Sequence, residues 1–158
     1  MSTPEKFFRE MNAMRVRDFL DTNIFVYSFS PEEKSKYPQA KKLIAEALAT
    51  GNGIISTQVI QEFFNVATRK FVTPLRREDA VTYLHEVLSP LCMVFPNQEY
   101  YELALKIQSH YEYSFYDSLI IAAARLGGCR RLLTEDMRTG QRVEGMLIVN
   151  PFVNKERG

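Results

Sequence analysis

Four acidic residues stand where the chain changes from one element of secondary structure to the next. Asp21 and Asp136 each follow a short strand-like run. Glu62 and Asp117 come early in segments whose apolar residues recur at helical spacing. In a right-handed parallel α/β fold, the carboxyl ends of strands and the amino ends of the following helices share one edge of the sheet. The four carboxylates are therefore expected to converge, although they lie far apart in the sequence.

Carboxylates that converge in one cleft repel one another, which raises their pKa values and destabilises the fold. A divalent cation removes that cost and becomes the largest local charge. Mg²⁺ and Mn²⁺ prefer oxygen ligands, and Mg²⁺ uses only one or two protein carboxylates. The chain has no cluster of Cys and His residues that would indicate zinc. The pattern therefore favours one or two Mg²⁺ or Mn²⁺ ions and hydrolysis of a phosphodiester, because such ions activate water and stabilise charge on the phosphate.

Each acid also has a purely structural interpretation. These are a capping turn at Asp21, a solvated helix face that Glu62 shares with Gln58, Asn65 and Arg69, a capping box formed by Ser114 and Asp117, and an exposed turn at Asp136. They account for the residues one at a time. They do not explain why all four collect at one end of one sheet.

The elements that would position these acids are short. Strands are expected at residues 16–20, 53–56, 91–95, 131–134 and 146–149, and helices at 37–50, 58–70, 76–88, 98–110 and 115–126. Thr57, Asn97 and Ser114 are the expected N-caps, and Pro90 is expected to stop the helix before it. Strands that alternate with helices indicate βαβ units and a mostly parallel sheet.

Composition is that of an ordinary globular domain. Hydrophobic residues make up 46% and charged residues 25% of 158 residues, which suits one core. The net charge of +1 neither indicates nor excludes nucleic acid. No apolar run approaches the roughly 18 residues that a membrane span needs, and the first residues lack a signal-peptide core. A cytoplasmic protein with two reduced thiols, Cys92 and Cys129, is the expectation.

The sequence predicts one domain with two short appendages. Residues 1–15 form an N-terminal extension that is expected to be flexible or loosely docked, residues 16–152 form the domain, and residues 153–158 form a tail.

Four short motifs, in order and at suitable spacing, resemble those of PIN-domain nucleases. They are FLDTNI (19–24), QEFFN (61–65), SFYDSLI (114–120) and LTEDM (133–137). The resemblance is closest to the VapC toxins of bacterial toxin–antitoxin pairs, to which the tail GQRVEGMLIVNPF (140–152) is also similar.

The resemblance implies a three-layer α/β/α domain and an endoribonuclease that depends on Mg²⁺ or Mn²⁺. It also implies a homodimer and a small antitoxin whose C-terminal peptide blocks the cleft. The carried-over site comprises Asp21 and Asp117 as direct metal ligands, Glu62 and Asp136 as the remaining acids, and Asn23 and Thr134 as supporting residues. Glu135 lies beside Asp136, and the sequence does not distinguish which of the two faces the metal; we favour Asp136.

Two further groups of residues have both a functional and a structural interpretation. Arg138 and Arg142 are candidate phosphate contacts, or part of a solvated charged surface. Tyr111, Tyr113, Phe115 and Tyr116 are candidates for stacking on unpaired bases, or for packing in the core or a dimer. The sequence also leaves open a PIN nuclease that acts in RNA processing or on DNA outside toxin–antitoxin systems, and a binding module that has lost catalysis.

Overall fold

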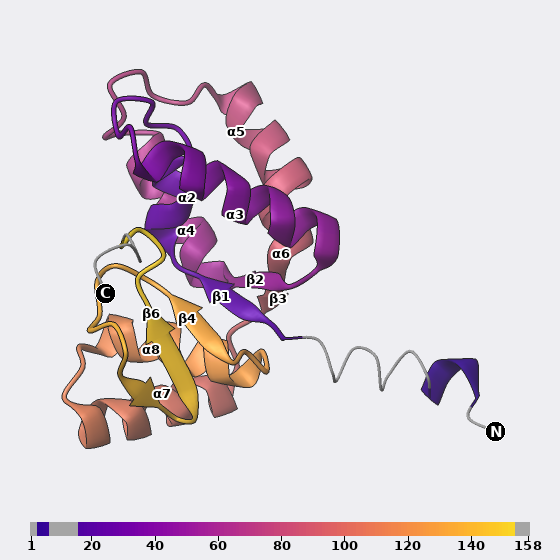
Figure 1. Ribbon diagram of the computed structural model, residues 1–158, viewed down its shortest axis with the longest axis vertical. Helices are drawn as coiled ribbons and strands as arrows, with labels where there is room; N and C mark the ends of the chain where they lie inside the picture. Colours follow the sequence, from indigo (N-terminus) through magenta and orange to yellow (C-terminus); the bar gives the residue numbers. More distant parts are fainter. Residues whose placement is uncertain (1–2, 7–15, 154–158) are drawn as a thin grey trace.

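Short apolar strands and amphipathic helices alternate along the chain, and the computed structural model assembles them into a six-stranded sheet with helices on both sides (Figure 1). The structure describes residues 3–6 and 16–153. The predicted N-terminal extension and C-terminal tail therefore lie mostly outside the described residues.

The strands are β1 (Asp18–Leu20), β2 (Gly53–Ser56), β3 (Cys92–Val94), β4 (Arg131–Leu133), β5 (Arg142–Val143) and β6 (Met146–Val149). The helices are α2 (Thr22–Tyr27), α3 (Lys36–Thr50), α4 (Thr57–Ala67), α5 (Arg77–Tyr83), α6 (Ser89–Leu91), α7 (Gln98–Tyr111) and α8 (Phe115–Leu126). A π-helical segment, η1 (Leu84–Leu88), joins α5 to α6.

The order of the strands determines where ligands can bind. The sheet runs β3-β2-β1-β4-β6-β5, and every neighbouring pair is parallel except β5 with β6. From β1 the chain adds β2 and then β3 on one side of the sheet, and it then crosses back to add β4 on the other side of β1. Such a reversal opens a crevice beyond the carboxyl ends of the two strands, where α/β sheets bind their ligands. Asp21 and Thr134 follow those two strands directly.

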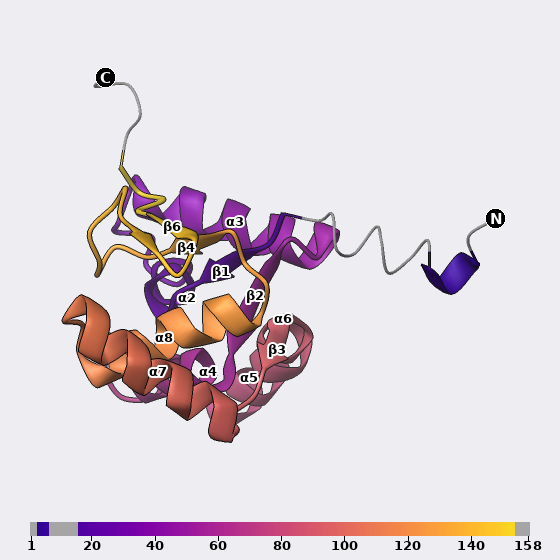
Figure 2. The ribbon, with the colours of Figure 1, turned by 90° about the horizontal axis from the view of Figure 1, so that it is seen from below.

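Two glycines show how closely helices approach the two faces of the sheet. A Cβ added at Gly53 would lie 2.5 Å from the Cβ of Ala47 on α3. A Cβ added at Gly127, just after α8, would lie 2.4 Å from Cδ1 of Ile54. Successive strand residues point to opposite faces, so α3 and α8 cover β2 from opposite sides, as Figure 2 shows. The predicted α/β/α layering is confirmed.

Several predicted boundaries were wrong for identifiable reasons. Pro90 does not stop the helical stretch, because it lies in the first turn of α6, where its missing N–H needs no partner. Ser56 rather than Thr57 is the N-cap of α4. The short α2 helix and the two-residue β5 strand were not predicted, because neither is long enough to show a hydrophobic period.

Other expectations were met. Asn97 and Ser114 cap α7 and α8 through side-chain hydrogen bonds to Tyr100 N and Asp117 N. Both cysteines are free and buried. Among the described residues, no helix is both long and apolar enough to traverse a bilayer.

Candidate active site

Asp21 lies at the junction between β1 and α2 and is held there by its neighbours. As the N-cap of α2, its Oδ1 accepts a hydrogen bond from Thr22 N at 2.7 Å. Its Oδ2 accepts from the hydroxyl of Thr134 at 2.7 Å, and its backbone N–H donates to Leu133 O at 3.1 Å. The capping interpretation is therefore correct, and it fixes the carboxylate at the β1–β4 crevice rather than removing it from the site.

The carboxyl group of Asp21 lacks a cationic partner among the described residues. Its side chain is buried with only 7% of the residue exposed. Burial raises the pKa of Asp21 to about 6, against the opposing effect of the two hydrogen bonds, and the negative charges of Glu62 and Asp136 raise it further. A buried acid with a raised pKa and no compensating cation is a common property of functional sites.

Glu62 reaches the same crevice from the second turn of α4, one turn later than its predicted position in the first turn. Its Oε2 accepts a hydrogen bond from the hydroxyl of Thr22 at 2.6 Å, and its Oε1 accepts from Nε2 of Gln58 at 2.9 Å. The solvated-face interpretation is wrong for Gln58, which is 8% exposed. It holds for Asn65, which is exposed on the same helix, and Arg69 is exposed in the turn after the helix.

Asp117 lies in the first turn of α8, as predicted, and its side chain is half-buried. Its backbone N–H donates to the hydroxyl of Ser114 at 3.1 Å, so Ser114 does cap the helix. Its charge nevertheless reaches Asp136, because it contributes to raising the pKa of Asp136.

The neighbouring acids Glu135 and Asp136 have different surroundings. Glu135 accepts a hydrogen bond from the hydroxyl of Tyr27 and forms an ion pair with Nζ of Lys36 at 3.0 Å. Asp136 has no cation beside it in the described chain. Nδ2 of Asn23 approaches its two oxygens at 3.2 and 3.3 Å, and its backbone N–H donates to Oγ1 of Thr134 at 3.1 Å. Glu135 is therefore neutralised within the fold, whereas Asp136 is not.

Partial burial raises the pKa of Asp136, and the charges of Glu135, Asp117 and Glu62 raise it further. Together with the effects on Asp21, these couplings show that all four predicted acids lie in one electrostatic field. Across residues 3–6 and 16–153, however, no three His, Cys, Asp or Glu side chains are close enough to bind an ion by themselves. An all-oxygen, uncompensated donor set fits Mg²⁺ or Mn²⁺, which complete their coordination with water and substrate oxygens.

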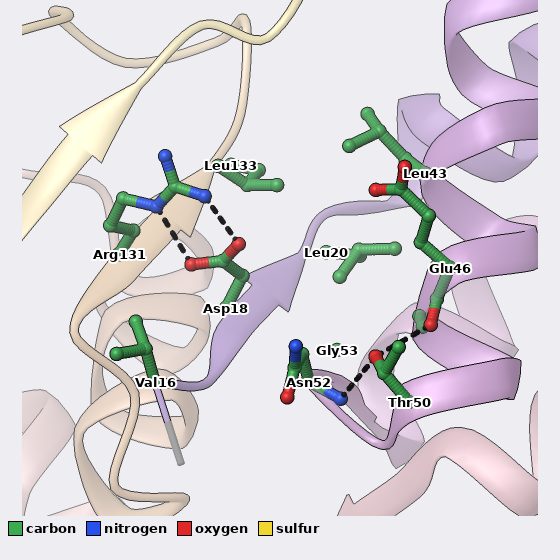
Figure 3. Close-up of a pocket in the computed structure, with 11 residues that line it drawn as sticks. Val16, Asp18, Leu20, Leu43, Glu46, Thr50, Asn52, Gly53, Arg131 and Leu133 are labelled. Atoms are coloured by element: carbon green, nitrogen blue, oxygen red, sulfur yellow. Dashed lines mark hydrogen bonds and ion pairs between the residues drawn. The ribbon is translucent and has the colours of Figure 1, made fainter. Parts of the chain in front are cut away.

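A cavity elsewhere on the sheet contains none of these four acids. It has a volume of about 500 Å³ and lies between α3 and the strands β1, β2 and β4. Figure 3 shows Asp18 and Arg131 paired across its wall, with Nε and Nη2 of Arg131 donating at 2.8 and 2.6 Å. Leu20 and Leu133 line the same cavity. Asp18 is paired with Arg131, and none of the four predicted acids lines this cavity, so the cavity is not where those acids act.

The arginine and aromatic residues that were candidate RNA contacts differ in their exposure. Arg138 and Arg142 are both exposed, and within the described chain neither pairs with an acid. Among the aromatic residues, Tyr111, Tyr113 and Phe115 pack against the core, which supports their structural interpretation. Tyr116 alone is largely exposed, at 69%, and it directly precedes Asp117.

Comparison with known families identifies the fold. A family model described as the PIN domain matches residues 19–144, which include all four acids. The chain belongs to the PIN-domain family. Among curated proteins, none matches this sequence.

Solved structures share the PIN-domain architecture. A toxin–antitoxin complex from Klebsiella pneumoniae superposes with a TM-score of 0.60 and 21% identity, covering 85% of this chain and 98% of that one. DNA-bound VapBC from Salmonella typhimurium gives 0.60 and 20%, covering 84% and 96%. VapC20 of Mycobacterium tuberculosis, a toxin that cleaves the sarcin–ricin loop, gives 0.54 and 17%, covering 73% and 86%. At these identities the likeness is one of fold.

Several contacts to the acids in this PIN domain were not predicted, among them those of Thr22, Gln58 and Lys36. Thr22 donates to Glu62, Gln58 donates to Glu62, and Lys36 pairs with Glu135. The contact of Gln58 has a signal in the sequence, because residues four apart on a helix are neighbours. The other two contacts join segments distant in the sequence and have no such signal.

Proposed function

We propose that this PIN domain is an endoribonuclease that depends on Mg²⁺ or Mn²⁺ and acts as the toxin of a VapC-type toxin–antitoxin pair. One observation carries the proposal. Four carboxylates, from Asp21, Glu62, Asp117 and Asp136, share one electrostatic field, and no basic side chain of the described chain pairs with any of them. Such a site attracts a hard divalent cation.

Asp21 and Asp117 would hold the cation. Glu62 would position the cation or its bound water, and Asp136 would bind through water or a second cation. When bound, the ion supplies activation of the attacking water and stabilisation of negative charge on the phosphate. Thr22 and Thr134 orient the carboxylate of Asp21 through their hydrogen bonds. This fixed geometry lowers the cost of reorganisation during the reaction.

RNA must also be held against a negatively charged crevice. Arg138 and Arg142 would contact its phosphates, because both are exposed and unpaired within the described chain. Tyr116 would stack on an unpaired base beside Asp117, since its ring is exposed at the rim of the site. Asn23 would hold Asp136 through its amide.

The toxin assignment rests on the motifs and on the fold shared with VapBC complexes. The proposal includes a homodimer located in the cytoplasm and a small antitoxin whose peptide blocks the crevice. The sarcin–ricin loop cleaved by the mycobacterial neighbour makes structured RNA the substrate to test first.

The decisive experiment is cleavage of a structured RNA by the purified protein and by Asp117→Asn. We expect cutting only with Mg²⁺ or Mn²⁺, and its near-complete loss in the variant. Asp79→Asn is the matched control, because Asp79 also lies in the first turn of a helix but on α5, outside the acidic cluster. Equal activity of Asp117→Asn and wild type would reject the site.

A second candidate is a PIN nuclease outside toxin–antitoxin systems. Expression in a bacterial host separates the two. The toxin proposal predicts growth arrest that the product of an adjacent small reading frame relieves. Normal growth with abundant active protein would instead favour a nuclease of RNA processing.

A further inference from the structure

Gln58 is a buried polar side chain that contacts three helices around the acidic crevice. It lies in the first turn of α4 and is 8% exposed. Its Nε2 donates to Oε1 of Glu62 at 2.9 Å and to the backbone carbonyl of Tyr116 at 3.2 Å. Its Oε1 accepts from the hydroxyl of Tyr100 on α7 at 3.3 Å. The amide is therefore satisfied on both sides, as buried polar groups normally are.

The orientation of this amide follows from the chemistry of its neighbours. An ionised carboxylate and a backbone carbonyl can only accept hydrogen bonds, so the NH₂ group of Gln58 must face Glu62 and Tyr116. The hydroxyl of Tyr100 can donate, and it meets the amide oxygen. The reverse orientation would place oxygen against oxygen on the side of the acids.

These contacts connect two of the four acids. The carbonyl of Tyr116 belongs to the residue before Asp117, in the turn that carries that carboxylate. The other oxygen of Glu62 accepts from Thr22, the residue after Asp21. Glu62 is thus held from both sides, and Gln58 is the link between it and the backbone next to Asp117.

We infer that Gln58 is a positioning residue for catalysis, which sets the placement of Glu62 relative to Asp117 by donating to Glu62 and to the carbonyl of Tyr116. The inference rests on the proposed function, because it assigns Gln58 to the same reaction. It acts through Glu62 and does not itself touch substrate or cation. Misplacement of a reacting group by about 1 Å lowers a rate by about 100-fold, so this support has a measurable effect.

The test compares Gln58→Met and Gln58→Glu with wild type. Methionine has a similar length but no donor, and glutamate keeps the shape while replacing the NH₂ group by an acceptor. Gln98→Met is the matched control, because Gln98 donates to Glu102 at 2.9 Å with the same four-residue spacing, but on the exposed side of α7. We expect kcat to fall about 10- to 100-fold in both Gln58 variants, with KM within about threefold of wild type and no change in the control.

A role in stability alone would give a different pattern, which a double-mutant cycle detects. If Gln58 acts through Glu62, adding Gln58→Met to a Glu62→Gln protein lowers kcat little further. A merely structural role would lower kcat by the same factor in both backgrounds. Additive losses, or kcat of Gln58→Met within about twofold of wild type, would overturn the inference.

A readout without RNA separates this inference from the proposed function. Mn²⁺ binding is measured by calorimetry on folded wild type, Gln58→Met and Gln98→Met, because neither substitution changes the charge of the protein. If wild type fails to cut RNA, the nuclease proposal falls. The positioning role still stands if Gln58→Met alone changes the Mn²⁺ affinity by about fivefold or more, and it falls if all three proteins bind equally.

Discussion

The adjacent parallel strands β1 and β4 have an aspartate and its hydrogen-bond donor at both their amino ends and their carboxyl ends. The two aspartates differ in the charge of that donor. At the amino end, Asp18 on β1 pairs with Arg131 on β4 through two hydrogen bonds, at 2.8 and 2.6 Å. At the carboxyl end, Asp21 follows β1 and meets Thr134, which follows β4, through one hydroxyl at 2.7 Å. The residue type and the strand pair are the same, but among residues 3–6 and 16–153 only the first acid has a cationic partner.

The difference separates an acid that belongs to the fold from one that is available for chemistry. A mostly buried carboxylate with a bidentate arginine is a structural pair. A buried carboxylate with only neutral donors keeps an uncompensated charge, which destabilises the protein unless something external binds. The pKa of Asp21 is raised, mainly because of its burial, since the buried charged form is less stable than the neutral form. Four predictions test the contrast.

The largest expected effect is on catalysis. Asp21→Asn should lower RNA cleavage by about 1,000-fold, because it removes a proposed ligand of the cation while keeping the shape of the side chain. Asp18→Asn should retain activity to within about fivefold. Initial rates with saturating Mn²⁺ measure both. Equal losses in the two variants would show that the two ends do not differ in function.

Without metal, the same substitution should stabilise the protein at neutral pH. Burial raises the pKa of Asp21 in the folded state to about 6, from the ordinary aspartate value of 3.8 that applies to an unfolded chain. The charged form of Asp21 therefore lowers the free energy of unfolding by about 3 kcal/mol above pH 6. This penalty decreases as the pH falls from 6 to 3.8 and is absent below 3.8. A lost hydrogen bond offsets about 1 kcal/mol, so Asp21→Asn should gain about 2 kcal/mol near pH 7 and lose about 1 kcal/mol near pH 3.

Urea unfolding with a chelator present, at both pH values, measures this change. The sign reversal is the informative result. A variant that is less stable than wild type at both pH values would mean that Asp21 is compensated by groups within the chain.

A smaller loss is expected at the balanced end. Arg131→Met should destabilise the protein by about 1 to 2 kcal/mol, because it leaves Asp18, with 17% of its side chain exposed, without its cation. The partial exposure of Arg131, 43%, keeps the loss below that of a fully buried pair. Thermal unfolding measures it, and the Mn²⁺ affinity should not change. A large fall in Mn²⁺ affinity would mean that the two ends are coupled.

The smallest effect concerns Lys36, which compensates Glu135 beside the site. Lys36→Met should lower stability by about 0.5 kcal/mol, since the pair is partly exposed, at 31% and 18%. It should also add one uncompensated negative charge next to Asp136 and so modestly tighten Mn²⁺ binding. A titration of activity against Mn²⁺ tests this. Weaker binding would indicate that Lys36 supports the site in another way.

Much of this arrangement could be predicted from local signals. The positions of Asp21, Asp117 and Asp136 at element boundaries follow from hydrophobic period and capping residues, which are local properties, whereas Glu62 lies one turn further into its helix than predicted. The layered fold follows from the alternation of strands and helices. The contrast between Glu135 and Asp136 could not be predicted, because it depends on Lys36, which lies 99 residues away in the sequence.

The errors have the same origin. Gln58 was predicted to lie on a solvated face because the sequence of its own helix does not indicate that α7 and α8 pack over it and bury it. Pro90 looked like a stop because a proline interior to a helix is unfavourable, yet η1 shifts the backbone so that Pro90 falls at the start of a new turn. Tertiary packing decides such cases.

The order of the strands has a consequence for the timing of activity during synthesis. β1 leaves the ribosome early, but its neighbour β4 begins only at Arg131, and β6 beyond it ends at Val149. Until these segments emerge, Asp21 lacks the hydroxyl of Thr134, and Asp136 does not yet exist in the chain. A nascent or prematurely terminated polypeptide therefore cannot assemble the proposed active site, and under the proposed function cleavage begins only after the last strands are complete.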